Sequence, residues 1–176
     1  MENKRIVIVG TSGSGKSTLA RKLAAKHGIP HIELDVLYWQ PGWVETPMPE
    51  FIGKIEKVLH ENTDWVICGN YNDARKLTLP AATHIIWLDT PLYLNLWRVL
   101  KRSVVRWLTQ KESFAGCPET FSHIFLTKKS LLLWVRNTHA ERRKKYTTML
   151  TTTNYPQAQI YRVKNSKEYN ATLQLV

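Results

Sequence analysis

Short runs of apolar residues alternate along the chain with longer segments in which apolar residues recur three and four positions apart. The runs cover residues 6–9, 31–34, 65–68, 84–88 and 159–163, and each stops at a glycine or a polar residue. Helical spacing follows over 18–25, 51–59, 92–108, 121–150 and 171–176, and we expect a break in the fourth of these near Asn137 and Thr138. This alternation predicts one α/β domain over residues 1–176, with five parallel strands covered by helices on both faces.

The segment 10–17 reads Gly-Thr-Ser-Gly-Ser-Gly-Lys-Ser and fits the pattern G-x-x-x-x-G-K-[ST] between a strand and a helix. Glycines there let backbone N–H groups turn toward a phosphate chain, and the helix N-terminus adds partial positive charge. Lys16 is expected to reach the β- and γ-phosphates, and the Ser17 hydroxyl to ligate Mg²⁺. The sequence therefore predicts that the chain binds a nucleoside triphosphate, ATP with Mg²⁺. The expected nucleotide-binding residues are Gly10, Thr11, Ser12, Gly13, Ser14, Gly15, Lys16, Ser17 and Thr18.

Composition narrows the class of protein. The chain has 176 residues, of which 43% are hydrophobic, enough for one domain with a full core. We expect no membrane span and no signal peptide ahead of the first strand. Two cysteines are too few for a disulfide framework or a zinc quartet, so a cytoplasmic setting is expected.

Positive charge is concentrated in one part of the chain. The net charge is +11, and residues 98–146 contain twelve Lys and Arg but three Glu, which accounts for +9 of it. Such a block could close around polyphosphate, bind DNA without sequence specificity, or form a solvated helical face with no partner.

Several segments outside the glycine loop resemble a known family. They are Leu-Asp-Val-Leu-Tyr-Trp at 34–39, Pro-Gly-Trp at 41–43, Gly-Asn-Tyr at 69–71 and Leu-Trp-Arg-Val-Leu at 96–100. The chain resembles nucleoside monophosphate kinases, and more narrowly the bacterial adenylate-kinase-like proteins labelled "DNA topology modulation protein". The resemblance implies a P-loop NTPase three-layer sandwich, with an acceptor-side flap at about 35–63 and a helical lid at about 103–125.

The resemblance extends to arginines of the basic segment. Arg98 and Arg102 are four residues apart and project from one helical face, with a spacing similar to the pair that opens the lid in adenylate kinases. Arg142 begins an Arg-x-x-x-Tyr spacing similar to the helix that returns from that lid. The resemblance implies that these arginines and Lys16 surround the transferring phosphoryl group, whereas exposed decoration of long helices is the alternative reading. Further candidates are Arg106 and Arg136.

The acceptor is expected between the second and third strands. Asp35, at the carboxyl end of a predicted strand, could orient an acceptor hydroxyl or lie near Mg²⁺. Tyr71 and Arg75 follow the third strand, and Arg75 resembles the arginine that grips the acceptor phosphate in adenylate kinases. Aromatic side chains that could stack on the acceptor, or pack within the flap, are Tyr38, Trp39 and Trp43.

One position departs from the family. Monophosphate kinases usually carry Asp-Gly after the third strand, where this chain has Cys68 and Gly69. Because Mg²⁺ prefers oxygen ligands, three alternatives stay open: Asp35 or Asp89 takes that place, metal binding and turnover are weakened, or the chain is no longer an efficient kinase. No basic partner is predicted beside Cys68. Cys117 and His123 make an incomplete zinc set.

Two functions from different classes follow. The first is a Mg²⁺-ATP-dependent kinase acting on a nucleotide, nucleoside or other small acceptor, with attack in line with the leaving group. The second is a DNA-binding regulator controlled by nucleotide, in which ATP closes the basic helices; no helix-turn-helix or zinc finger is present in the sequence to support it. The acceptor, the oligomeric state and ATP against GTP, whose base would lie near loop residues 165–168, stay open.

Overall fold

The computed structural model describes residues 3–109, 117 and 131–176, and at its centre is a parallel sheet with the strand order β2-β5-β1-β6-β7. Every pairing in this sheet is parallel, and β1 lies in the middle, between β5 and β6. The strands are β1 (Arg5–Gly10), β2 (His31–Glu33), β5 (Trp65–Cys68), β6 (His84–Leu88) and β7 (Gln159–Val163). A separate antiparallel hairpin joins β3 (Trp39–Gln40) to β4 (Val44–Glu45).

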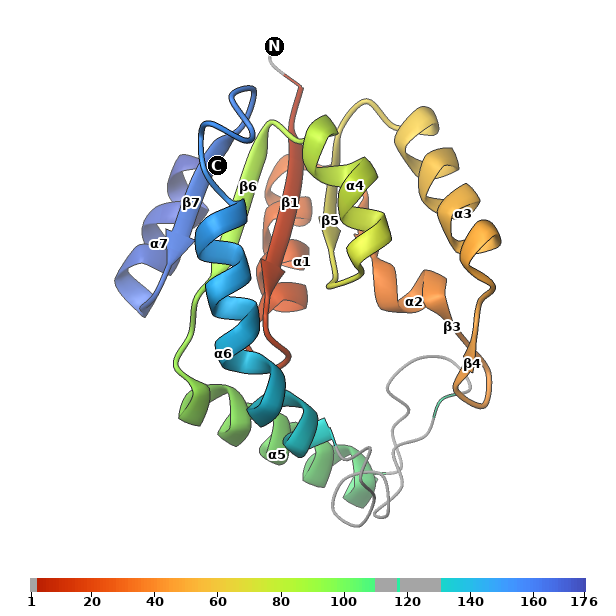
Figure 1. Ribbon diagram of the computed structural model, residues 1–176, viewed down its shortest axis with the longest axis vertical. Coiled ribbons are helices and arrows are strands. Elements are labelled where there is room, and N and C mark those ends of the chain that lie inside the picture. Colours follow the sequence, from red (N-terminus) through yellow and green to blue (C-terminus); the bar gives the residue numbers. More distant parts are fainter. Residues whose placement is uncertain (1–2, 110–116, 118–130) are drawn as a thin grey trace.

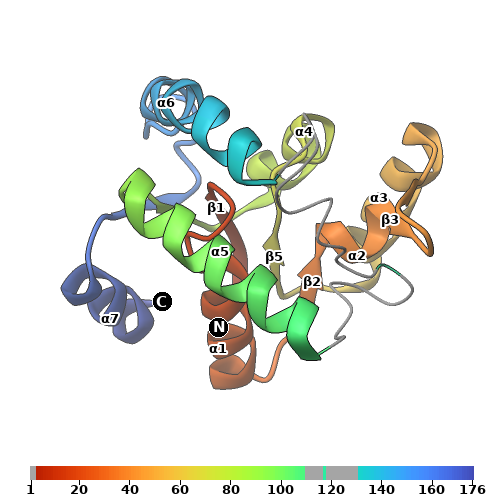
Figure 2. The same cartoon turned by 90° about the horizontal axis from the view of Figure 1, so that it is seen from below.

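Helices cover both faces of the sheet, as Figures 1 and 2 show. Successive residues of β1 point to opposite faces, so Ile6 and Ile8 enter one core and Val7 and Val9 the other, and all four are buried. The first core is closed by α1 (Lys16–His27) and α7 (Ser166–Leu175). The second is closed by α3 (Met48–Glu61), α4 (Asn72–Ala81) and α6 (Leu131–Met149). The short α2 (Leu34–Tyr38) follows β2 directly, and α5 (Leu92–Thr109) crosses the carboxyl ends of the strands (Figure 2).

The predicted fold class is confirmed: the five strands and the helices on both faces match the α/β sandwich expected of a P-loop protein. Two helix boundaries were predicted wrongly. The described helix α6 runs through Asn137 and Thr138 without a break, because Val135 is fully buried and the Thr138 hydroxyl bonds back to the Trp134 carbonyl at 2.7 Å. The last helix begins earlier than expected, since the Asn165 side chain caps it by accepting from the Glu168 backbone N–H at 2.9 Å.

Those two residues belong to the segment in which a loop around the nucleotide base was expected, and the segment is instead the cap and first turn of α7. The Pro-Gly-Trp segment at 41–43 lies in the turn of the β3–β4 hairpin. Of the predicted lid, 103–109 forms the end of α5, whereas 110–116 and 118–125 lie outside the described residues, as does the start of the fourth helical segment.

Candidate functional site

The glycine loop between β1 and α1 has the backbone that a phosphate cradle requires. Gly13 and Gly15 adopt φ angles of 81° and 98°, in the left-handed region that favours glycine. A Cβ on Gly13 would lie 2.5 Å from the carbonyl oxygen of Asn95, so α5 packs directly on the loop. In the described part of the chain, Ser14 Oγ is buried without a hydrogen-bond partner. A buried polar atom in a loop of this shape fits the oxygen-rich surroundings of a bound polyphosphate.

Lys16 lies over this loop with its charge poorly solvated. Its Nζ donates to the Thr11 carbonyl at 3.1 Å, and burial lowers the pKa of Lys16 from its ordinary value of 10.5 to about 8. A buried ammonium gains most from an anion placed beside it, because burial has removed the competing water. The side chain is therefore suited to hold a phosphate oxygen.

The loop opens on a cleft of about 760 Å³, which is lined by residues at the carboxyl ends of β1, β2 and β5. Of the predicted catalytic and acceptor residues, Lys16, Asp35, Arg98, Arg102, Arg142, Trp39 and Tyr71 line it. Of the predicted nucleotide-binding residues, Ser12, Gly13, Gly15, Lys16, Ser17 and Thr18 line it. Lining residues that the sequence did not single out are Arg21, Glu33, Asn70 and Trp134.

Two arginines reach the cleft from different helices. Arg98, on α5, donates from Nη1 to the Ser14 carbonyl at 3.3 Å, so it contacts the glycine loop itself. Arg142, on α6, packs its guanidinium 4.1 Å from the centre of the Trp134 ring, and burial lowers its pKa. One Arg142 nitrogen, Nη1, is buried with no hydrogen-bond partner among the described residues. The helices thus bring together cations that are far apart in the sequence.

Asp35 lies in the first turn of α2, two residues beyond the end of β2 at Glu33, and not at the end of the strand as expected. The Tyr71 hydroxyl donates to Asp35 Oδ1 at 2.7 Å, and burial together with this carboxylate raises the pKa of Tyr71 far above its ordinary value. Tyr71 therefore stays a neutral donor, which keeps the Asp35 carboxylate oriented in the cleft.

Two predicted acceptor residues lie elsewhere. Arg75 is buried and does not line the cleft: its Nη1 donates to the Tyr146 hydroxyl at 2.9 Å, and its Nη2 to Asn72. Tyr38 packs against Phe51 at 5.1 Å and against Tyr71 at 4.6 Å between ring centres. For Tyr38 this is the packing alternative that the sequence left open, whereas Arg75, which was expected to grip the acceptor phosphate, binds Tyr146 and Asn72 instead.

The surroundings of Cys68 correct two expectations. Glu33 pairs in register with Cys68, and its carboxylate accepts a hydrogen bond from Ser17 Oγ, the group expected to ligate Mg²⁺. His31 Nε2 lies 3.3 Å from Cys68 Sγ, so a basic partner does stand beside this thiol. Burial raises the pKa of Cys68 to about 12, and the thiol stays protonated. The carboxylate next to Ser17 is therefore Glu33, which the sequence did not single out.

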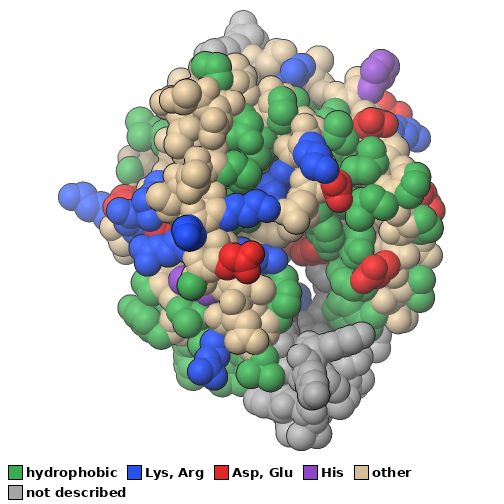
Figure 3. Space-filling model, viewed as in Figure 1, with side chains coloured by type: hydrophobic (Ala, Val, Ile, Leu, Met, Phe, Trp, Pro, Cys, Tyr) green, Lys and Arg blue, Asp and Glu red, His purple; other side chains and the backbone are tan. Residues whose placement is uncertain are grey.

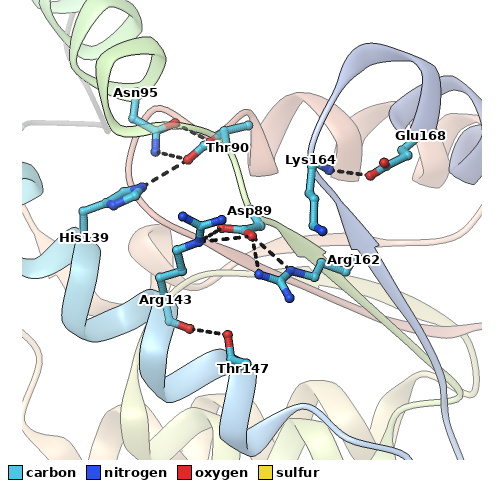
Figure 4. A network of polar contacts seen from close by, with 9 residues as sticks. All are labelled: Asp89, Thr90, Asn95, His139, Arg143, Thr147, Arg162, Lys164 and Glu168. Atoms are coloured by element: carbon cyan, nitrogen blue, oxygen red, sulfur yellow. Dashed lines mark hydrogen bonds and ion pairs between the residues drawn. The ribbon is translucent and has the colours of Figure 1, made fainter.

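Asp89, which was considered as a residue near Mg²⁺, forms ion pairs with two arginines instead. Its side chain is 3% exposed and forms ion pairs with Arg143 on α6, at 3.0 Å, and with Arg162 on β7, at 2.7 Å (Figure 4). Beside this pair of contacts, His139 Nε2 lies 3.1 Å from the Thr90 carbonyl. Asp89 thus ties α6 to the ends of β6 and β7 and has its oxygens occupied.

A second network, which the sequence did not indicate, joins α6 to the glycine loop. Asn70 donates from Nδ2 to the Gly10 carbonyl at 2.6 Å, and the Tyr146 hydroxyl donates to Asn70 Oδ1 at 3.0 Å. Asn70 follows β5 in the Gly-Asn-Tyr turn, which was noted only as a family resemblance. The helix that carries Arg142 is thereby positioned relative to the loop.

The described residues bear on two further expectations, the incomplete zinc set and the absence of a membrane span. Over 3–109, 117 and 131–176, no group of three or more His, Cys, Asp and Glu side chains could hold a metal ion. Cys117 Sγ donates to the Gln40 carbonyl at 3.2 Å, and His123 lies outside those residues. None of the helices in the same ranges is both long and apolar enough to cross a membrane.

The sequence matches no family profile and no curated protein. Similar solved structures include shikimate kinase from Bacteroides thetaiotaomicron, at 15% identity and a TM-score of 0.55, covering 98% of this chain and 95% of that one. Shikimate kinase from Acinetobacter baumannii in complex with shikimate has 16% identity and a TM-score of 0.56, covering 98% and 90%. A gluconokinase from Sinorhizobium meliloti has 15% identity and a TM-score of 0.50, covering 98% and 92%.

At these identities the likeness establishes the fold, which is that of P-loop small-molecule kinases and has the nucleoside-monophosphate-kinase type of sheet. The structures named above give no support to the narrower resemblance to the DNA topology modulation group.

Proposed function

We propose that this chain is a Mg²⁺-ATP-dependent kinase that transfers the γ-phosphoryl group to a hydroxyl of a small acceptor. The observation that carries the proposal is the shared cleft: the glycine loop with Lys16, three arginines from α5 and the Asp35 carboxylate all line one cavity. Phosphoryl transfer asks for cations around the transferring group and a base for the acceptor proton, and little else from the protein.

The donor half of the cleft has the residues for a metal-bound nucleotide. Ser17 and Glu33 would hold Mg²⁺, since both offer oxygen and contact each other. The metal, when bound, would offset the negative charge of the phosphates. Lys16, Arg98 and Arg142 then stabilise the negative charge that develops as the bond to the leaving phosphate breaks.

The acceptor half supplies the proton acceptor. Asp35 takes the hydroxyl proton as the acceptor oxygen bonds to phosphorus, and Tyr71 keeps the carboxylate oriented through its hydrogen bond. The products are ADP and the phosphorylated acceptor, and the proton resides on Asp35 until it exchanges with water. Two structures with a similar fold, a shikimate kinase and a gluconokinase, support a small hydroxylated acceptor of this general kind.

Regulation of DNA is the second candidate. Figure 3 shows Lys and Arg side chains gathered over α6. Lys144 and Lys145, which belong to this helix, are exposed. Arg143, however, is paired with Asp89, and the cations of the cleft face inward. Non-specific attraction to DNA needs no more than exposed lysines, so these observations favour the kinase.

The test is ADP release from Mg²⁺-ATP over a panel of nucleoside monophosphates, nucleosides and hydroxylated metabolites, alongside equilibrium nucleotide binding. Lys16→Ala should abolish both activity and tight nucleotide binding. Asp35→Asn should keep nucleotide binding and lower acceptor-dependent turnover by roughly 10²- to 10⁴-fold, the usual contribution of a general base. If wild-type protein binds nucleotide and no acceptor stimulates it, the kinase proposal is wrong. Salt-dependent DNA binding with and without ATP then becomes the next experiment.

A further inference from the structure

Helix α5 turns its apolar side away from the core. The residues that it buries are Asn95, Val99 and Ser103, of which only Val99 is hydrophobic. An amphipathic helix beside a sheet ordinarily buries its apolar stripe against the core. In α5 the apolar residues that follow one another three and four positions apart lie on another face of the helix. This face, which we call the outer stripe, consists of Tyr93, Trp97, Leu100, Val104 and Leu108.

The outer stripe is exposed along the helix. Tyr93, Trp97 and Leu108 have exposed fractions of 74%, 61% and 66%, and Leu100 and Val104 are partly exposed. Figure 2 shows α5 in front of the sheet when the molecule is seen from below, and Figure 3 shows hydrophobic side chains gathered over the start of this helix. The helix rises about 22 Å between the two ends of the stripe. An exposed apolar face of this length is typical of a surface that contacts a partner.

A hollow of about 460 Å³ lies between the outer stripe and the first turns of α6. Side chains of the stripe line it from α5, and Leu133 and Arg136 line it from α6. Arg136 was considered as a phosphate ligand, but it lines this hollow and not the cleft. On the other side of the stripe is Lys101, which is exposed. The described residues therefore form a ridge beside a shallow hollow that is walled on one side, by α6.

The charge around the outer stripe is positive. Helix α5 contains no Asp or Glu, and α6 contains one, Glu141, which lies on another face of that helix from Arg136. Lys101 and Arg136 thus flank the stripe on its two sides. A second copy of the chain docked through the same face would bring these cations close to their own copies, and like charges would oppose it. An anionic partner is attracted instead.

We propose that the outer stripe docks the protein on an anionic lipid bilayer, with α5 lying in the plane of the surface. The rings of Tyr93 and Trp97 enter the boundary between headgroups and acyl chains, where amphipathic rings are favoured. Lys101 and Arg136 contact the phosphate groups of anionic lipids. A ridge with apolar residues along it and cations beside it fits a flat lipid surface, whereas an acidic peptide would be supported by α6 on one side and by solvent on the other.

The test is sedimentation with vesicles of phosphatidylcholine and phosphatidylglycerol in equal parts, compared with vesicles of phosphatidylcholine alone. A protein of net charge +11 is attracted to any anionic surface, so apolar variants decide the outcome. Trp97→Ser should weaken binding to the anionic vesicles about tenfold, because the indole no longer leaves water. The matched control is Leu175→Ser, which removes an apolar side chain that is 71% exposed and should have no effect. Leu175 ends α7, which runs away from α5 (Figure 1).

Further variants test the cations and guard against misfolding. Lys101→Gln and Arg136→Gln should each weaken binding about fivefold, the usual contribution of one cation near an anionic membrane. Lys57→Gln removes the same charge from an exposed position near the end of α3, which also runs away from α5, and should change binding less than about twofold. Melting temperatures show whether each variant folds. Tyr93→Ser is the second apolar variant, with the same expected loss as Trp97→Ser.

Three results would overturn the proposal. If the wild-type protein does not bind the anionic vesicles, a lipid surface is not the partner. If Trp97→Ser and Tyr93→Ser bind as tightly as the wild type, the attraction is general electrostatics. If the protein forms dimers without lipid and Trp97→Ser dissociates them, the outer stripe is an interface between two copies. None of these measurements uses nucleotide, so the proposal and the kinase function can fail independently.

Discussion

The proposed nucleotide side and the proposed acceptor side of the cleft are built by different kinds of contact. The nucleotide side is one continuous loop whose shape is local: glycines at positive φ, a helix start, and Lys16 bonded back to Thr11 five residues earlier. The acceptor side is assembled from α2, the β3–β4 hairpin, the β5–α4 turn and the end of α5, with Asp35 held by a tyrosine 36 residues away. The glycine loop tolerates few substitutions because each residue of it shapes the same backbone turn. On the other side, a substitution in one element can leave the other elements unchanged. This difference accounts for a glycine loop that is easily recognised from the sequence beside a proposed acceptor side that is not.

The largest effect is expected where the local geometry is tightest. Gly13→Ala places a Cβ 2.5 Å from the Asn95 carbonyl at a φ of 81°, so the loop must distort. We expect nucleotide affinity to fall at least about 100-fold, since the left-handed conformation alone costs about 1–2 kcal/mol and the clash adds to it. Titration with an ATP analogue measures the loss.

The matched control lies on the acceptor side. Gly42, in the hairpin, has a nearly equal φ of 77° but open space around its Cβ position. Gly42→Ala should therefore cost about 1 kcal/mol of unfolding free energy and leave nucleotide affinity unchanged. If the two substitutions weaken nucleotide binding equally, the contrast between the two sides is wrong.

A smaller effect is expected where the two sides meet, at Ser17. Glu33→Gln removes the carboxylate that accepts from the Ser17 hydroxyl, and a neutral amide is a weaker partner for Mg²⁺. The Mg²⁺ concentration needed for half-maximal nucleotide binding should rise about tenfold. The control is Cys68→Ser, at the residue of β5 that pairs with Glu33 of β2. It adds and removes no charge, so it should leave the Mg²⁺ requirement unchanged. If Cys68→Ser changes the Mg²⁺ requirement and Glu33→Gln does not, the assignment of the metal to Glu33 is wrong.

Features set by local sequence could be predicted, whereas features set by contacts between distant segments could not. The three central strands β1, β5 and β6 are visible because they are buried on both faces, and the glycine loop because its contacts are local. Glu33 was missed because its importance depends on the register between β2 and β5, which sequence spacing does not encode. Arg75 was placed at the acceptor, but a hydroxyl from α6 and the side chain of Asn72 take its guanidinium.

Helix α4 shows a related limit. It was not predicted, since it contains Pro80 near its end and only a short apolar face, and its burial against the sheet stabilises it nonetheless. In the same way, burial of Val135 carries α6 through two residues of low helix propensity. Tertiary packing decided each of these outcomes.

The last prediction concerns pH and distinguishes the two sides by the groups that titrate. Burial lowers the pKa of Lys16 to about 8 in the free protein, and a bound polyphosphate raises it again by supplying negative charge. Nucleotide binding therefore takes up a proton above pH 8, and affinity should fall up to about tenfold per pH unit between pH 8 and 10. Because the pKa of the lysine is higher in the unfolded chain, this group also makes the nucleotide-free protein more stable as pH rises across the same window. Lys16→Met should remove both dependences, while Arg106→Gln should keep them. If nucleotide affinity of the wild-type protein does not change from pH 7 to 10, Lys16 keeps its ordinary pKa in the free protein. Nucleotide binding then takes up no proton at this residue.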